Sequence, residues 1–238
     1  MLDFGALAYL DMHKTGSSTI VSFLQECGRF ERATGVRHNF MRRAPRPNVF
    51  YLSSVRNPLP LYISLFRYGC DGLGKVQERL TAMGHADLYQ PTNDHFAAWM
   101  DHMTQAENIA RIFPKFARPA RLGFGLMTIR HICYSIPRPL YNLSRCDSPA
   151  EVLDLYARTR CVDLYIRNES LQDGLTELST DRLREHFDED KCAAFWADER
   201  RARANRSKSG GGVTFTFSDE MHGVLRENEA LLFERFYN

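Results

Sequence analysis

The sequence predicts an α/β protein with a central parallel sheet and helices on its faces. Two apolar runs, at residues 6–12 and 49–55, are each followed closely by a pattern typical of a helix. A third apolar run, at residues 161–167, has the length of one more strand. Because strands that alternate with helices favour a parallel sheet covered on both sides, we expect a three-layer arrangement.

Length and composition agree with an ordinary globular protein. The chain has 238 residues, of which 44% are hydrophobic and 25% are charged, and these values exclude disordered and fibrous classes. A chain of this length buries one substantial core, so we expect a single domain over residues 1–238. Apolar runs fall short of the roughly 20 residues of a membrane span, and the N-terminus lacks the pattern of a secretory signal. We therefore expect a cytoplasmic protein.

The first strand leads into a loop whose composition suits an anion. The loop consists of His13, Lys14, Thr15, Gly16, Ser17, Ser18 and Thr19, and apolar residues at helical spacing follow it. Backbone N–H groups at a helix N-terminus lack intrahelical partners and attract negative charge. We expect Gly16 to allow close approach of a ligand, Lys14 to supply positive charge, and the loop hydroxyls to add donors. A helix start capped by Ser or Thr, without a ligand, is the alternative.

The spacing of this loop differs from that of nucleoside triphosphatases. In their loop, G-x-x-x-x-G-K-[ST], the lysine follows the second glycine, whereas Lys14 precedes Gly16. The shorter loop suits an anion shorter than a triphosphate. We also expect no apolar strand to end in an aspartate of the kind that holds magnesium in phosphoryl transfer.

The second strand, at residues 49–55, ends at Arg56. Asn57 followed by Pro58 predicts a helix start, with an N-cap before proline at the first helical position. Ser64 lies within that helix. The donors of Arg56 and the hydroxyl of Ser64 could together hold a second phosphate, and a capped strand exit without a ligand is the alternative.

Residues 70–145 read as helical segments broken by prolines, and we expect them to form an insertion that faces the acceptor. Between Ile109 and Arg145 there are seven Lys or Arg and no Asp or Glu. This stretch is either an ordinary solvated face or a surface that attracts an anionic acceptor or lipid headgroup, with peripheral membrane contact. Further helices are expected at 190–204 and 219–236.

Metal binding is not expected. The six cysteines are scattered without a CxxC pair, and no His/Cys cluster has zinc-ligand spacing. We interpret them as reduced, mostly buried thiols.

Taken together, the motifs resemble those of the sulfotransferases that use 3′-phosphoadenosine 5′-phosphosulfate (PAPS). H-K-T-G-S-S after the first strand, followed by S-V-R-N-P-(x)5-S-L-F from Ser54 to Phe66, matches the order and placement of that family's two donor motifs. The segment Tyr165–Leu171 is similar to the family's strand ending in Glu-x-Leu, and Asn205-Arg206-Ser207 is similar to its nucleotide-covering loop. The spelling of the first motif, and His38-Asn39-Phe40, look most like the carbohydrate and glycolipid members of the galactose 3-O group.

This resemblance implies a P-loop-like fold, PAPS as the donor and no metal. It assigns the 5′-phosphosulfate to the 14–19 loop, the 3′-phosphate to Arg56 and Ser64, and the nucleotide cover to Asn205 and Ser207. The acceptor is then a hydroxyl of a carbohydrate, glycolipid or small molecule. We expect no nucleic-acid partner, and the oligomeric state stays open.

Sulfuryl transfer in this scheme needs a cation and a base. We expect Lys14 to stabilise charge on the bridging oxygen. Histidine is the favoured general base because it titrates near neutral pH, and His38, at the family position before the second strand, ranks ahead of His13. The other six stay open as candidates: His85, His95, His102, His131, His186 and His222.

Two other functions are compatible with the sequence. The first is a P-loop kinase of a small molecule that uses ATP with magnesium. The second is a non-catalytic module that binds an anion or a membrane through its basic stretch.

Overall fold

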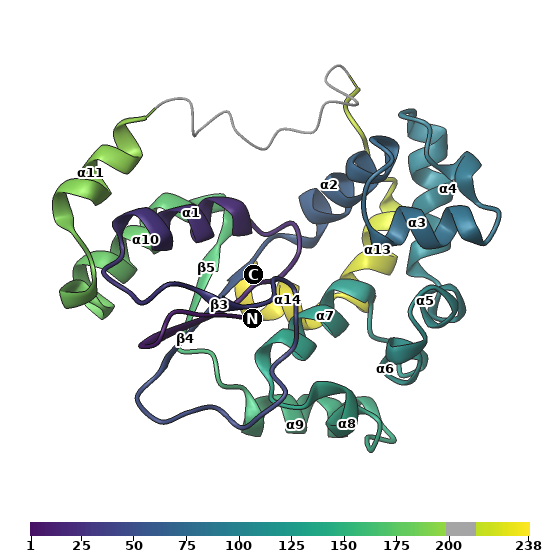
Figure 1. Ribbon diagram of the computed structural model, residues 1–238. Helices are drawn as coiled ribbons and strands as arrows, with labels where there is room; N and C mark the ends of the chain where they lie inside the picture. The colour runs from purple at the N-terminus through teal and green to yellow at the C-terminus, as the bar shows by residue number, and fades with distance from the viewer. Residues whose placement is uncertain (199–212) are drawn as a thin grey trace. The chain divides into compact units, whose positions relative to one another are not determined.

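The computed structural model describes residues 1–198 and 213–238, and the chain divides into two compact units. In the described residues, unit 1 comprises 1–56, 131–139 and 158–198, and unit 2 comprises 57–130, 140–157 and 213–238 (Figure 1). The expected single domain over residues 1–238 stays a prediction. No helix in the described part of the chain combines the length and hydropathy that a bilayer crossing needs.

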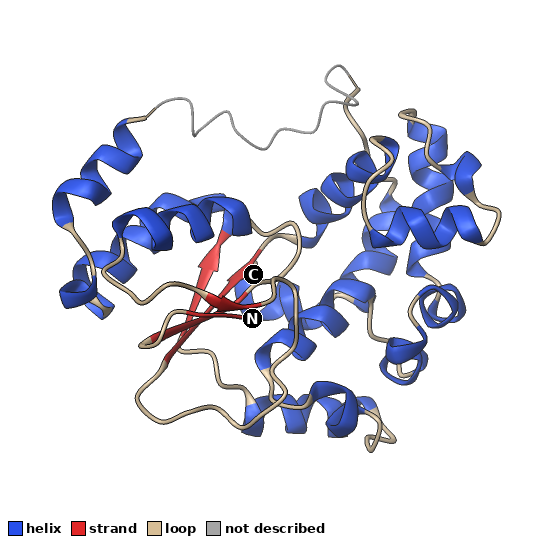
Figure 2. Ribbon diagram, viewed as in Figure 1, coloured by secondary structure: helices blue, strands red, loops and turns tan. Residues whose placement is uncertain are grey.

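Unit 1 is built on a sheet of five strands (Figure 2). The strands are β1 (Leu2–Asp3), β2 (Leu7–Leu10), β3 (Thr34–Gly35), β4 (Phe50–Val55) and β5 (Leu164–Arg167), in the order β3-β1-β2-β4-β5. β2, β4 and β5 are parallel, as expected, but β1 pairs antiparallel with both β2 and β3. The sheet is therefore mixed rather than wholly parallel. The reversal comes from a tight turn between β1 and β2, in which Gly5 has φ of 82° and Phe4 N–H donates to the Leu7 carbonyl at 2.8 Å.

The three parallel strands end at the same edge of the sheet. Leu10 pairs with Ser53, and Val55 pairs with Arg167, so β2, β4 and β5 finish within a few residues of one another in register. Open α/β sheets bind ligands at this carboxyl edge, since the loops and helix N-termini gather there.

Helices cover one face of this sheet with a continuous apolar cluster. They are α1 (Ser17–Cys27), α10 (Leu171–Glu177) and α11 (Glu189–Ala197). The cluster includes Leu7, Tyr9, Ile20, Phe23, Leu24, Leu52, Ile166, Leu175, Leu178 and Phe195. Of the helix expected at 190–204, the structure describes α11, and residues 199–212 lie outside the described residues. Short 3-10 or π turns connect these elements at Asn168–Ser170, Leu178–Arg182 and Arg184–His186.

Unit 2 is helical. Residues 70–145 form helices without a strand, as the sequence predicts. Three helices, α7 (Leu126–Ser135), α8 (Pro139–Leu143) and α9 (Pro149–Thr159), have residues in both units. The other described helices of unit 2 are α2 (Pro58–Cys70), α3 (Lys75–Ala82), α4 (Asn93–Thr104), α5 (Ala106–Ile112), α6 (Ala117–Arg121), α13 (Asp219–Asn228) and α14 (Ala230–Phe236), with 3-10 turns at Ala86–Leu88 and Pro114–Phe116. The start of α2 is as expected, because Pro58 opens the helix and Asn57 Oδ1 accepts a hydrogen bond from Leu59 N–H.

The C-terminal segment is two helices, so the single helix expected at 219–236 is wrong. α13 ends at Asn228 and α14 begins at Ala230. The residue between them, Glu229, is fully buried, and its carboxylate accepts hydrogen bonds from Tyr62 Oη at 2.6 Å and from the backbone N–H groups of Met127 and Thr128 at 3.1 and 2.6 Å. The helix breaks where this carboxylate turns inward to cap the N-terminus of α7.

Candidate active site at the carboxyl edge of the sheet

The loop between β2 and α1 has the backbone of an anion-binding corner. Lys14 and Gly16 have φ of 64° and 86°, both in the left-handed region. α1 begins at Ser17 without a side-chain cap, and its first backbone bond runs from Ile20 N–H to the Gly16 carbonyl at 3.2 Å. The amides before that bond lack intrahelical partners. A Cβ at position 16 would lie 2.6 Å from Nδ2 of Asn168, so the sequence needs glycine here.

Arg56 lies against this loop. It follows β4, and its Nη1 donates a hydrogen bond to the Lys14 carbonyl at 3.3 Å. The structure therefore brings Arg56 of the second motif to the first motif within unit 1. Ser64 is half-buried on α2 in unit 2. Asn205 and Ser207 lie outside the described residues.

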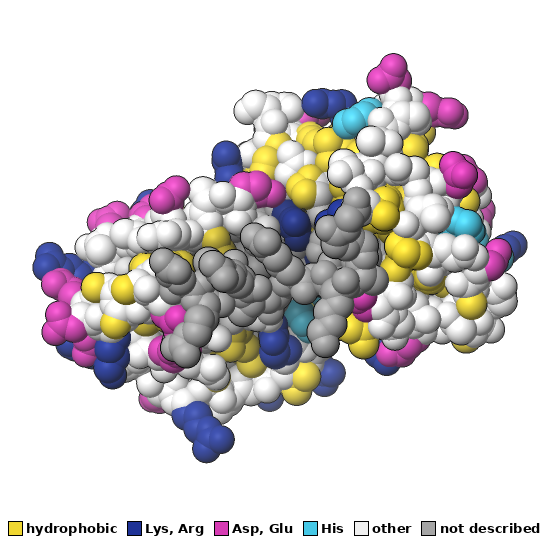
Figure 3. Space-filling model, turned by 90° about the horizontal axis from the view of Figure 1, so that it is seen from above, with side chains coloured by type: hydrophobic (Ala, Val, Ile, Leu, Met, Phe, Trp, Pro, Cys, Tyr) yellow, Lys and Arg dark blue, Asp and Glu magenta, His cyan; other side chains and the backbone are white. Residues whose placement is uncertain are grey.

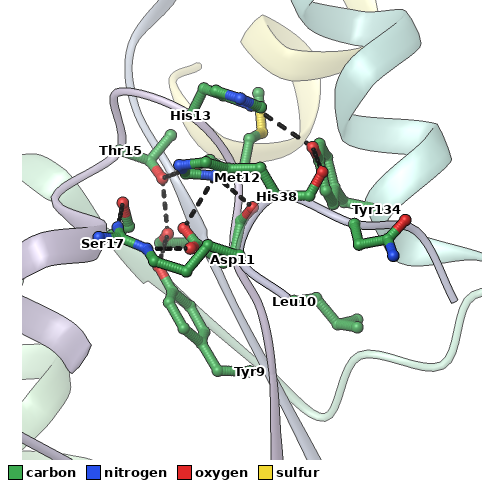
Figure 4. Close-up of polar contacts among 12 residues, drawn as sticks. Tyr9, Leu10, Asp11, Met12, His13, Thr15, Ser17, His38 and Tyr134 are labelled. Carbon is green, nitrogen blue, oxygen red and sulfur yellow. Dashed lines mark hydrogen bonds and ion pairs between the residues drawn. The ribbon is translucent and has the colours of Figure 1, made fainter. Parts of the chain in front are cut away.

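Two of the loop hydroxyls are used inside the protein. Thr15 is fully buried; its Oγ1 donates to the Met12 carbonyl at 2.9 Å and lies 2.6 Å from Ser54 Oγ. Ser54 Oγ in turn lies 2.8 Å from the hydroxyl of Tyr9 (Figure 4). Ser17 Oγ accepts from Arg37 at 2.8 Å. These hydroxyls hold the loop in shape.

Ser18 is the exposed member of the loop, and Thr19 beside it is half-buried. With the hydroxyl of Thr15 engaged and that of Ser17 accepting from Arg37, the loop can still offer a ligand its backbone amides, the charge of Lys14 and the hydroxyls of Ser18 and Thr19.

Asp11 is the central residue of the site that sequence reasoning missed. It directly follows β2 and is fully buried. One carboxylate oxygen, Oδ2, accepts from Arg37 Nε at 2.8 Å, and the other, Oδ1, lies 3.3 Å from His38 Nδ1. A strand therefore does end in an aspartate, contrary to our expectation. Its carboxylate is engaged by a guanidinium and an imidazole.

The two candidate base residues, His13 and His38, are stacked on each other. Their ring centroids are 3.7 Å apart with an interplanar angle of 21° (Figure 4). Tyr134, on α7, donates from its hydroxyl to the His38 carbonyl at 2.9 Å, and the same hydroxyl lies 3.4 Å from His13 Nδ1. Burial lowers the pKa of His38 below its ordinary value, although the carboxylate of Asp11 opposes this shift. The direction of this shift favours the neutral imidazole.

The basic stretch at residues 109–145 does not form a uniform cationic face. Five of its seven cations contact acidic or aromatic groups nearby: Arg118 bonds Asp147, Arg121 lies 3.9 Å from Glu107, Lys115 lies over Phe116, Arg130 over Phe113, and Arg145 over Tyr141. Figure 3 shows the face seen from above, which is not specific to this stretch; there too, Lys and Arg side chains are interspersed with Asp and Glu. These contacts favour the ordinary solvated surface over a dedicated anion-binding face.

The site thus offers amides and two cations for an anion, together with a stacked imidazole pair for proton transfer. Among the described residues there is no group of three or more His, Cys, Asp or Glu arranged to hold a metal ion. Comparison with protein-family models, with curated proteins and with solved structures finds no match. The motifs and the geometry of this corner are therefore the features that indicate a function.

Proposed function

We propose that the chain is a sulfotransferase that moves a sulfuryl group from PAPS to a hydroxyl of a carbohydrate, glycolipid or small-molecule acceptor, on a P-loop-like scaffold. The observation that carries the proposal is the contact between Arg56 Nη1 and the Lys14 carbonyl oxygen at 3.3 Å. It joins the two segments whose spelling resembles donor-binding motifs. They meet at the carboxyl edge of parallel strands, where α/β proteins bind nucleotides.

The corner fits the phosphosulfate end of the donor. The left-handed φ of Gly16 shapes the loop, and the uncapped start of α1 offers an anion backbone amides and the positive end of the helix dipole. Lys14 adds a full positive charge beside these amides. Asn168, at the end of β5, has its amide group next to Gly16 and can donate to the same anion.

The chemistry needs a proton acceptor near the donor loop, and the histidine pair supplies one. His13 precedes Lys14 in the chain and stacks on His38, so both imidazoles lie beside the loop. Positioning and stabilisation of developing charge supply most of the rate in transfers of this kind. Lys14 would stabilise charge on the oxygen that leaves the sulfur, while a neutral histidine takes the proton of the acceptor hydroxyl.

Calorimetry tests the donor assignment directly. We expect the wild-type protein to bind adenosine 3′,5′-bisphosphate without a metal and to bind it more tightly than ATP with magnesium. Lys14→Ala should weaken binding of the bisphosphate by about tenfold or more, because a charge-assisted contact contributes about 1.5–3 kcal/mol. Lys75→Ala is the matched control, since this exposed lysine pairs with Glu78 on α3 in unit 2. Tighter binding of ATP with magnesium would instead favour a kinase.

A further inference from the structure

A buried carboxylate and a backbone carbonyl both face one ring nitrogen of His38. Oδ1 of Asp11 lies 3.3 Å from His38 Nδ1, and the backbone oxygen of Asp11 lies 3.1 Å from the same nitrogen. Both oxygens are acceptors when the carboxylate is ionised, so they favour the imidazole tautomer that carries its hydrogen on Nδ1. The other ring nitrogen, Nε2, then has a lone pair that can take a proton.

Its surroundings also hold His38 in a strained backbone conformation. His38 has φ of 55°, a left-handed value that is unfavourable for a residue with a side chain. Tyr134 Oη donates to its carbonyl, and the neighbouring Arg37 is tied to both Asp11 and Ser17. A strained residue that several contacts hold in place is typical of functional sites, where the surroundings impose an orientation.

We infer that His38 accepts the acceptor's proton through Nε2 and that Asp11 is the residue that positions it for this role. The role of His38 as a base rests on the proposed function, whereas its tautomer follows from the contacts with Asp11 alone. Between the two stacked rings, the choice falls on His38 because the carboxylate of Asp11 lies 3.3 Å from its Nδ1 and, when ionised, stabilises the imidazolium that forms.

The groups around His38 agree with a base that is neutral before the reaction. Asp11 faces it from the end of β2, His13 from the donor loop and Tyr134 from α7, while Arg37 and the α-amino group of Met1 add positive charge nearby. Burial has the largest effect and lowers the pKa of His38, Asp11 raises it, and the two positive groups lower it. Proton uptake therefore relies on the carboxylate, the one negative group in this set.

In the transfer, one bond to sulfur forms as another breaks, and one proton moves. As the acceptor oxygen forms its bond to sulfur, its proton passes to Nε2 of His38. The bond between sulfur and the bridging oxygen breaks, and its electron pair stays on the 5′-phosphate of adenosine 3′,5′-bisphosphate, next to Lys14. The imidazolium, paired with Asp11, then returns its proton to water.

The tautomer can be measured without donor or acceptor. The measurement uses ¹⁵N-labelled wild-type protein at about pH 7.5 to 8, roughly one unit above the ordinary histidine pKa. The ¹⁵N chemical shifts of the His38 ring should report a protonated Nδ1 and an unprotonated Nε2. In Asp11→Asn the pKa of His38 should fall, because the negative charge is lost. Asp3→Asn, which removes a carboxylate from the surface of the same unit, should leave it unchanged. A His38 protonated on Nε2, or a pKa unchanged in Asp11→Asn, would overturn the inference.

Kinetics supply the second readout. With PAPS and an accepted hydroxyl, His38→Gln should lower kcat by about 100-fold or more, and Asp11→Asn should lower kcat with little change in bisphosphate affinity. Arg37→Gln guards against a folding defect, since it breaks the ion pair with Asp11 but leaves the Asp11–His38 pair, and should cost less than Asp11→Asn. Equal activity in Asp11→Asn and wild type contradicts the positioning role. Absence of sulfuryl transfer by the wild type contradicts the proposed function, while the tautomer measurement still decides the role of Asp11.

Discussion

Arg56 donates a hydrogen bond to the carbonyl of Lys14, at 3.3 Å, across 42 positions of sequence. Each residue lies just beyond the end of a parallel strand, and β2 and β4 are direct neighbours in the sheet. The contact follows from the topology, because adjacent parallel strands deliver their next residues to the same edge. The contact therefore holds the guanidinium of Arg56 against the backbone of the 14–19 loop.

Gly16→Ala should destabilise the protein by more than the left-handed φ alone would cause. The left-handed φ alone costs about 1–2 kcal/mol for a residue with a Cβ, and the new methyl would lie 2.6 Å from Asn168 Nδ2. Gly123→Ala isolates the first effect, since Gly123 has φ of 89° and open space around its Cβ position. Chemical denaturation should show a larger loss for Gly16→Ala than for Gly123→Ala, and equal losses would mean that the close approach of Asn168 is unimportant.

Thr15→Val should destabilise the protein through its buried hydroxyl. Valine keeps the shape but removes the donor to the Met12 carbonyl and the partner of Ser54, and leaving buried polar groups unpaired costs about 1–3 kcal/mol. Thr15→Ser keeps the hydroxyl and removes only a methyl group. Its loss of stability should therefore be the smaller of the two. Thermal unfolding of the three proteins measures this. If Thr15→Val is as stable as wild type but fails to bind nucleotide, the hydroxyl contacts the ligand instead.

Glu229 should make the stability of unit 2 depend on pH. Burial raises the pKa of Glu229 above its ordinary value, although the hydroxyl of Tyr62 and the amides at the start of α7 oppose the shift. A raised folded pKa means that the folded state keeps a proton which the unfolded state has released. The contribution to the free energy of unfolding is therefore fully present below pH 4.5 and is lost as the pH rises through the folded pKa.

Glu229→Gln removes this titration. The stability of wild type relative to Glu229→Gln should be greatest at acid pH and should decline as the pH rises above the unfolded carboxyl pKa. Glu227→Gln is the matched control, because Glu227 is exposed on α13. Urea titrations should be made from about pH 4 to about pH 8, which brackets the ordinary pKa values of Glu and His. If the free energy of unfolding of Glu229→Gln and that of Glu227→Gln followed parallel curves against pH, this account would be contradicted.

The elements around the site could be predicted because local signals define them. The apolar run before the loop, the Asn57–Pro58 helix start and the apolar run before Arg56 each encode one element within a few residues. β1 and β3 could not be predicted, since each has two residues and their pairing depends on the turn at Gly5. The break at Glu229 was missed for a similar reason: its capping partners lie on other helices.

The candidate site was predicted in part. Lys14, Gly16 and Arg56 could be identified from motif order, and His13 and His38 from the chemistry of the reaction. Asp11 carried one readable signal, a charged residue at the end of an apolar run, but its two partners come from a loop that has no periodicity. Tyr134 and Asn168 reach the corner only through tertiary packing, which no local pattern encodes.

The central claim is that the two motifs hold one donor. It is tested by comparing how tightly the protein binds two adenosine nucleotides, one with and one without a 3′-phosphate. Wild-type protein should bind adenosine 3′,5′-bisphosphate more tightly than adenosine 5′-monophosphate. Arg56→Ala should weaken the bisphosphate about tenfold and erase this preference, Lys14→Ala should weaken both ligands, and Arg46→Ala, an exposed arginine paired with Asp3, should change neither. An Arg56→Ala protein that still prefers the bisphosphate by the wild-type margin would contradict the account.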